Sequence, residues 1–210
     1  MRGWRDPVTW PKDAVYPDAS RKGALWSQRH GCVVCLPRLI HPRPDRSHIY
    51  PTGLALERIA MRALLVVDVQ TDVMKGRNTE GLIEACNDII GRYAPKNVVY
   101  IVNKLPWESS AKEKELGAGL NVVSNLLFDK KRSNAFSNPG LLRALRDMGA
   151  DEVEIIGIDG NHCVKATALG ALANGLGATV NVRAVASRNE AAFEKTKRRL
   201  RAAGVELANG

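Results

Sequence analysis

Three residue types that can carry hydrolytic chemistry stand at the ends of apolar runs. Cys163 follows the run VEIIGI and the turn DGNH, Asp68 lies near the end of ALLVVDV, and Lys130 follows NLLFD. A cysteine at a helix N-terminus can form a thiolate, because backbone N–H groups and a nearby ammonium stabilise the anion. A carboxylate in an apolar pocket has a raised pKa and can accept the thiol proton. Together these residue types suit nucleophilic attack on an acyl group.

Each of these residues also has a structural alternative. Cys163 can be a buried structural thiol, Asp68 can cap a turn, and Lys130 can be a solvated member of the DKKR cluster. His162 is the only histidine after residue 48. Because neighbouring helical residues point about 100° apart, His162 is poorly placed to hydrogen-bond the Cys163 sulfur, and a Cys-His dyad is disfavoured.

Strand-like and helix-like segments alternate after residue 60. The strand-like runs are 63–69, 97–102, 125–129, 153–158 and 178–186, and the helix-like segments are 79–93, 138–149, 162–174 and 189–203. Such alternation predicts an α/β domain over 61–210, with a mainly parallel sheet, helices on both faces and three layers. Open sheets of this kind bind ligands at the carboxyl ends of their strands, where Asp68, Lys130 and Cys163 are expected.

The polar segment 104–124 fits the alternation poorly. It follows a strand's carboxyl end and contains glycines, so it is a candidate lid over the site. Trp107 is either its apolar contact with substrate or a side chain buried against the domain.

Residues 1–60 differ in composition from the rest of the chain. They hold seven of the ten prolines and show no sustained periodicity. We expect either a Pro-rich extension without its own core or upstream residues that precede a natural start at Met61, which intact mass of the native protein would test. The segments HGCVVC and IHPRPDRSH supply His30, Cys32, Cys35, His41 and His48, a weak zinc signal because a second tight pair is missing.

Composition narrows the function classes. Of 210 residues, 45% are hydrophobic and 25% charged, and neither a membrane-spanning run nor a secretory signal is visible, so we expect a cytoplasmic protein with no membrane partner. The four cysteines are expected to be free thiols. The net charge of +9 raises nucleic acid as a partner, but the basic run KTKRRLR lacks interleaved aromatics, so we expect none.

The three motifs together resemble a known family. ALLVVDVQTD, KKRSNAF and GIDGNHCVKATALGA, in this order, resemble those of the isochorismatase-like cysteine hydrolases, which include nicotinamidases, and the resemblance covers about residues 61–190. It implies that Asp68 is the general base, Lys130 a supporting cation and Cys163 the nucleophile of a thioester intermediate. Lys130 is favoured over Lys131 because it stands six residues before Phe136.

The resemblance also bears on the surroundings of these residues. It implies a cis peptide at Ile158–Asp159, with the backbone N–H groups of Asp159 and Cys163 forming an oxyanion hole. Phe136 and His162 become candidate substrate contacts beside Trp107. The metal-binding relatives carry an Asp and two His between the first strands and the lysine motif. This chain has no histidine between residues 48 and 162, so we expect neither a metal nor another cofactor.

Asp159 departs from the family pattern. It stands where a small or apolar residue is usual, and it either favours a cationic substrate or caps the helix that begins near Asn161, the interpretation that we prefer. The resulting prediction is a hydrolase that cleaves the C–N bond of a small amide. Isochorismatase-type vinyl-ether hydrolysis and a catalytically idle binding or assembly role remain alternatives, and homo-oligomers are expected by analogy alone.

Overall fold

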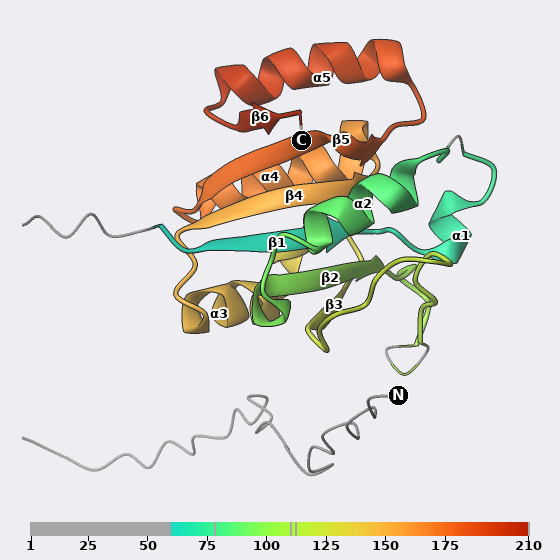
Figure 1. Cartoon of the computed structure of the whole chain (residues 1–210), viewed down its shortest axis with the longest axis horizontal. Helices are drawn as coiled ribbons and strands as arrows, with labels where there is room; N and C mark the ends of the chain where they lie inside the picture. The colour runs from blue at the N-terminus through green and yellow to red at the C-terminus, as the bar shows by residue number, and fades with distance from the viewer. Residues whose placement is uncertain (1–59, 78, 110, 112, 210) are drawn as a thin grey trace, which may run out of the picture. The chain divides into compact units, whose positions relative to one another are not determined.

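A six-stranded parallel sheet with helices on both faces forms the domain (Figure 1). The computed structural model describes residues 60–209 apart from residues 78, 110 and 112. The strands are β1 (Arg62–Val67), β2 (Val98–Asn103), β3 (Leu127–Lys130), β4 (Glu152–Ile158), β5 (Gly177–Ala186) and β6 (Glu206–Ala208). Their order in the sheet is β3-β2-β1-β4-β5-β6, and every adjacent pair is parallel. The predicted three-layer α/β class is confirmed.

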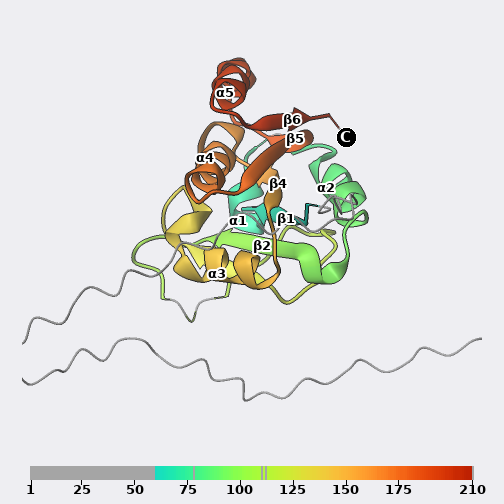
Figure 2. The ribbon, with the colours of Figure 1, turned by 90° about the vertical axis from the view of Figure 1, so that its left-hand side faces the viewer.

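The helices cover the two faces of this sheet unequally. They are α1 (Thr71–Met74), α2 (Leu82–Ile90), α3 (Pro139–Asp147), α4 (Lys165–Ala173) and α5 (Glu190–Ala202), with the 3₁₀ turns η1 (Pro95–Asn97) and η2 (Ala135–Ser137) and the π-helical turn η3 (Gly160–Val164). Figure 2 shows α2 on one side of the sheet and α3 and α4 on the other.

Alternating side chains of strand β1 pack into the two hydrophobic clusters of the core, one on each face of the sheet. Leu64 and Val66 pack with the buried residues of α2, whereas Leu65 and Val67 pack with those of α3 and α4. Because successive side chains of a strand point to opposite faces, the apolar run of β1 is buried on both sides. Asp68 follows this run directly and is therefore held at the end of a strand that is buried on both faces.

The structure differs from the expected segments at several places. Helix α2 begins at Leu82 rather than near residue 79, because Gly81 is in the left-handed conformation with φ 69° and ends the preceding loop. Cys163 lies in η3, a turn before α4, rather than at the first turn of a regular helix. Strand β6 was not expected, since three residues carry too little pattern.

Segment 104–124 contains no helix or strand among its described residues, although Leu116 forms an isolated bridge with Gln70. Trp107 is 79% exposed, so the alternative that it is buried against the domain is wrong, and its contact with substrate stays a prediction. The predictions for residues 1–59, including the candidate zinc ligands, fall outside the described residues.

Candidate active site

The structure brings Asp68, Lys130 and Cys163 together in one cluster. The Lys130 ammonium lies 2.8 Å from Asp68 Oδ2 and 3.4 Å from Cys163 Sγ. It also lies 3.4 Å from Asn103 Oδ1. A single buried cation therefore bridges a carboxylate and a thiol that are separated by 95 positions in the chain.

Strand ends explain how these distant residues meet. Asp68 follows β1, Lys130 ends β3, and Cys163 lies in η3, shortly after β4. Because the strands are parallel, their carboxyl ends share one edge of the sheet. Asp68 adopts a left-handed φ of 54°, and its N–H donates to the carbonyl of Ile101 at 2.9 Å. This backbone bond ties the turn after β1 to the neighbouring strand β2.

Burial controls the charge state of the cluster. Desolvation raises the pKa of Asp68 above its ordinary value, although the charge and hydrogen bond of Lys130 act against it. Desolvation, followed by the charge of Asp68, raises the pKa of the Cys163 thiol to about 11, and Lys130 offsets only part of this effect. These effects favour the neutral thiol over the thiolate at neutral pH, so Cys163 needs a base that accepts its proton.

One oxygen of Asp68 is left available. The Lys130 side chain is 0% exposed and bonds Oδ2, so its alternative as a solvated lysine is wrong. Asp68 Oδ1 is buried and has no hydrogen-bond partner among the described residues. A buried acceptor without a donor is costly, and this one belongs to the same carboxylate that raises the pKa of Cys163. The cluster therefore contains a free acceptor beside a protonated nucleophile.

The turn before Cys163 carries the expected cis peptide at Ile158–Asp159. The Asp159 side chain accepts hydrogen bonds from the N–H of Asn161 at 2.8 Å and of Arg188 at 3.2 Å. It also forms an ion pair with Arg77, at 2.8 Å. Burial alone would raise the pKa of Asp159, but these donors outweigh it and hold the pKa below the ordinary value. The preferred interpretation of Asp159 as a cap agrees with these contacts.

The three candidate substrate contacts are less closely gathered. His162 is exposed in η3, and Trp107 is exposed in the segment after β2. Phe136 lies in η2 and packs, partly buried, against the core on the α4 side. None of these side chains bonds the Asp68–Lys130–Cys163 cluster within the described residues, so their role stays a prediction.

Sequence reasoning missed three polar residues around the cluster. Asn103 is the last residue of β2, and its place at a strand's carboxyl end was a usable signal. Arg77 and Arg188 lie in loops without periodicity, and nothing in the sequence marks them as partners of Asp159. The structure alone reveals them.

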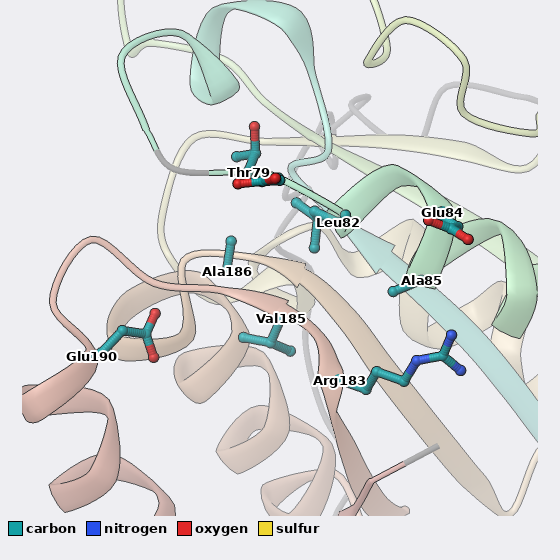
Figure 3. A pocket seen from close by; sticks show the side chains of 10 residues that line it. Thr79, Leu82, Glu84, Ala85, Arg183, Val185, Ala186 and Glu190 are labelled. Atoms are coloured by element: carbon teal, nitrogen blue, oxygen red, sulfur yellow. The ribbon is translucent and has the colours of Figure 1, made fainter.

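The described residues line several cavities, which differ in their relation to the Asp68–Lys130–Cys163 cluster. One of about 310 Å³ is lined by Asp72, Val73, Lys75, Arg77, Asn103, Leu105, Lys114 and Arg188. Another, of about 300 Å³, includes Lys130, but it meets only the main chain there because the side chain is wholly buried. The largest described cavity, about 440 Å³, lies between α2 and the end of β5 and contains none of the three clustered residues (Figure 3).

The described residues contain no group of three or more His, Cys, Asp or Glu side chains that could hold a metal ion. In the same part of the chain, no helix is long and apolar enough to cross a membrane.

Comparisons with known proteins agree with the motifs. The family model described as Isochorismatase domain matches residues 62–209. A search of curated proteins found no match. Among solved structures, N-carbamoylsarcosine amidase from Thermoplasma acidophilum is 23% identical with a TM-score of 0.59, over 70% of this chain and 95% of that chain.

Two further solved structures are similar over nearly their whole length. The pyrazinamidase of Pyrococcus horikoshii in complex with zinc is 22% identical with a TM-score of 0.55, over 71% of this chain and 99% of that chain. The nicotinamidase of Staphylococcus aureus is 23% identical with a TM-score of 0.56, over 72% and 99% respectively. At these identities the structures show a shared fold. Because the family match spans well over half of the chain, this protein belongs to the isochorismatase family of hydrolases.

Proposed function

We propose that this protein hydrolyses the C–N bond of a small amide through a thioester on Cys163. The observation that carries the proposal is the contact of one buried ammonium, that of Lys130, with both Asp68 and Cys163. A neutral thiol needs a base to become a nucleophile. Asp68 offers a raised pKa and an unbonded oxygen in the same cluster.

The first half-reaction follows from these charge states. Asp68 accepts the thiol proton as the sulfur attacks the carbonyl carbon, forming the S–C bond. The backbone N–H groups of Asp159 and Cys163 would stabilise the resulting oxyanion. The C–N bond then breaks, and protonated Asp68 returns the proton to the leaving nitrogen, which departs as ammonia or an amine.

Water completes the reaction by the same route. Asp68 takes a proton from water as the oxygen attacks the thioester, the C–S bond breaks, and the acid product leaves. The sulfur regains the proton held by Asp68. Lys130 stays protonated throughout and limits the cost of negative charge on either neighbour.

We further propose that the reaction needs no metal ion. His162, the one histidine among the described residues, lies exposed in η3 beside the nucleophile. Those residues also provide no group of three or more metal-ligating side chains. Treatment with a chelator should therefore leave amide turnover intact, and loss of turnover that added zinc restores would contradict this part of the proposal.

Ammonia release from a panel of small amides, including nicotinamide and pyrazinamide, tests the proposed function. Cys163→Ala should abolish release, and Cys86→Ala is the matched control because Cys86 is a buried cysteine within α2, on the other side of the sheet from the α4 core. In the wild type, an acyl adduct should appear on the Cys163 peptide by mass spectrometry. Ammonia release that survives Cys163→Ala would contradict covalent catalysis by Cys163.

A further inference from the structure

The cavity of about 310 Å³ beside the proposed site is rich in positive charge. Four of its lining residues are cationic and one is anionic: Lys75, Arg77, Lys114 and Arg188 against Asp72. These residues come from the connection between β1 and α2, the segment after β2, and the loop after β5. All three segments lie at the carboxyl edge of the sheet, where Asp68, Lys130 and Cys163 also lie.

Two of the four cations already have partners. Arg77 pairs with Asp159 at 2.8 Å. Lys114 pairs with Asp72 at 2.6 Å and with Glu108 at 2.9 Å. The four cations and the three carboxylates of these ion pairs together carry a net charge of +1, and Lys75 and Arg188 are the two cations outside the pairs.

Lys75 and Arg188 make no ion pair within the described part of the chain. Lys75 also lines a second hollow together with Glu113 and Glu115, so these carboxylates offset part of its positive charge. Arg188 lines the first cavity, and its backbone N–H donates to Asp159. This bond holds the main chain of Arg188 in place and leaves the guanidinium free to bind an anion.

The cavity is connected to the proposed chemistry by contacts at two points. Asn103 lines it and lies 3.4 Å from the Lys130 ammonium. Arg77 and Arg188 line it and bond Asp159, whose carbonyl accepts the N–H of His162 beside Cys163. These contacts make the cavity the candidate binding place for a substrate group next to the reacting carbonyl.

The cavity of about 440 Å³ has the opposite charge. Figure 3 shows Glu84, Glu190 and Arg183 around it, and Glu80 also contributes to its lining. Arg183 pairs with Asp88 at 2.5 Å. Arg183 is therefore a control for Arg188, since both arginines line a cavity near the carboxyl end of β5, but only the cavity of Arg188 includes Asn103, which contacts Lys130.

We propose that the substrate is a small amide bearing a carboxylate, which the Arg188 guanidinium binds in the 310 Å³ cavity. The proposal rests on the proposed function. It reverses the cationic substrate that Asp159 alone suggested, because Arg77 neutralises that carboxylate and Arg188 adds an unpaired positive charge. A guanidinium binds a carboxylate through two parallel hydrogen bonds, so Arg188 would set specificity.

Alkylation of Cys163 tests the cavity without requiring turnover. Iodoacetate and iodoacetamide both transfer a carbon to the sulfur with loss of iodide, but only iodoacetate is anionic. The ratio of the iodoacetate rate to the iodoacetamide rate at Cys163 is independent of the thiol pKa, because both reagents react with the same thiolate. N-acetylcysteinamide gives the corresponding ratio for a thiol in a small neutral molecule. We expect the ratio in the full chain, read on the Cys163 peptide by mass spectrometry, to exceed that of the free thiol by about tenfold.

Variants separate Arg188 from the permanent charge of Lys130. Arg188→Gln should bring the ratio down by about tenfold. Arg188→Lys should retain only part of the ratio, because an ammonium keeps the charge and loses the paired hydrogen bonds. Arg183→Gln should leave the ratio at the wild-type value. High salt should lower the wild-type ratio. A ratio equal to that of the free thiol, or a raised ratio that Arg188→Gln does not change, would overturn the proposal.

Turnover supplies the second test. The amides are malonamate, succinamate and glutaramate, compared with butyramide as a neutral amide and 4-aminobutyramide as a cationic one. We expect at least one anionic amide to have the highest kcat/KM, with its advantage over butyramide reduced about tenfold in Arg188→Gln. A preference for the neutral or cationic amide would contradict the anionic substrate and leave the amidase proposal standing. A raised alkylation ratio with no hydrolysis of any amide would instead count against the proposed function.

Discussion

Two buried carboxylates at the ends of neighbouring strands behave in opposite ways. Asp68 follows β1, Asp159 follows β4, and each forms an ion pair of 2.8 Å with one cation. Yet the pKa of Asp68 is raised and that of Asp159 is lowered. The difference lies in the other donors. Backbone N–H groups and Ser187 also bond Asp159, whereas Asp68 Oδ1 has no partner among the described residues.

This comparison shows how two similar carboxylates in one fold can take different roles. Desolvation is the largest effect on both carboxylates, so burial alone does not distinguish them. Hydrogen bonds to the charged form stabilise it, and Asp159 has enough of them to remain an anion that shapes the turn before Cys163. Asp68 has fewer of them, its pKa stays raised, and it is suited to exchanging a proton. The incompletely satisfied carboxylate is therefore the one to which we assign chemistry.

Asparagine at each position gives the largest contrast. Asp68→Asn removes the proposed base and should lower kcat/KM for any amide substrate by about 10³-fold, within the range typical of general-base removal. Asp159→Asn leaves the backbone N–H groups of the turn in place and should cost about tenfold or less, on the scale of one neutral hydrogen bond. Initial rates of ammonia release measure both effects.

Folding must be checked for this pair, because Asp68→Asn leaves the buried Lys130 ammonium without its anion. Circular dichroism at the assay temperature would show whether each variant is folded. In the wild type, kcat/KM should rise with pH through the raised pKa of Asp68, and this rise should be absent in Asp68→Asn. Equal losses of activity in the two folded variants would refute the division of roles.

Gly157 lies in β4 and pairs with Val67 at the end of β1, so it stands where the two strands that precede these carboxylates meet. Its φ is 118°, and a Cβ there would lie 2.0 Å from the carbonyl oxygen of Val67, the residue before Asp68. Gly157→Ala should therefore destabilise the domain by about 3 kcal/mol, through both a clash and backbone strain. Urea unfolding followed by circular dichroism measures the change.

A second glycine separates strain from clash. Gly175 also has a positive φ, 79°, but open space surrounds the position of its Cβ. Gly175→Ala should cost about 1 kcal/mol, the usual penalty of a left-handed residue. If the two substitutions cost the same, the close approach of β4 to β1 is not what requires glycine at residue 157.

Much of the fold could be predicted from the sequence because its signals are local. The apolar run that forms β1 predicts a strand from its own residues, and the Asn138-Pro139 pair predicts the start of α3. Strand β6 could not be predicted, because its three residues gain strand structure only by pairing with β5. The parallel arrangement then implied that Asp68, Lys130 and Cys163 would share one edge.

The charge environment of the site could not be predicted in the same way. The ion pair between Arg77 and Asp159 spans 82 positions, and a loop arginine carries no periodicity that would place it. The sign of a pKa shift depends on how many donors reach a buried carboxylate, which is a property of the folded turn. For this reason the sequence left two roles for Asp159, a contact with a cationic substrate and the preferred helix cap, and the structure then revealed its partners.

A smaller effect tests the structural carboxylate directly. Asp159→Asn should lower the free energy of unfolding at neutral pH by about 2 kcal/mol, because it weakens charge-assisted bonds with Arg77 and the turn. Since the folded pKa of Asp159 lies below its unfolded value near 3.8, this contribution is present above pH 3.8 and disappears as the pH falls through the folded pKa. Urea unfolding from pH 7 to pH 3 measures it.

The control for this pH dependence is Asp147→Asn, at the exposed end of α3. It should change stability by less than about 0.5 kcal/mol at either pH. A difference between wild type and Asp159→Asn that stays constant down to pH 3 would show that the lost stability does not come from the charge of Asp159.

The thiol itself gives the finest test of the comparison. The charge of Asp68 helps to raise the pKa of Cys163 to about 11, so Asp68→Asn should lower that pKa and make iodoacetamide alkylation at pH 8 several-fold faster. Asp159→Asn should leave the alkylation profile near that of the wild type, because Asp159 is not among the groups that shift this thiol. Faster alkylation together with lost turnover would separate the two roles of Asp68: it opposes a resting thiolate by its charge, and it enables catalysis only by taking the proton as the sulfur attacks. Slower alkylation in Asp68→Asn would mean that Asp68 instead maintains a thiolate before substrate binds.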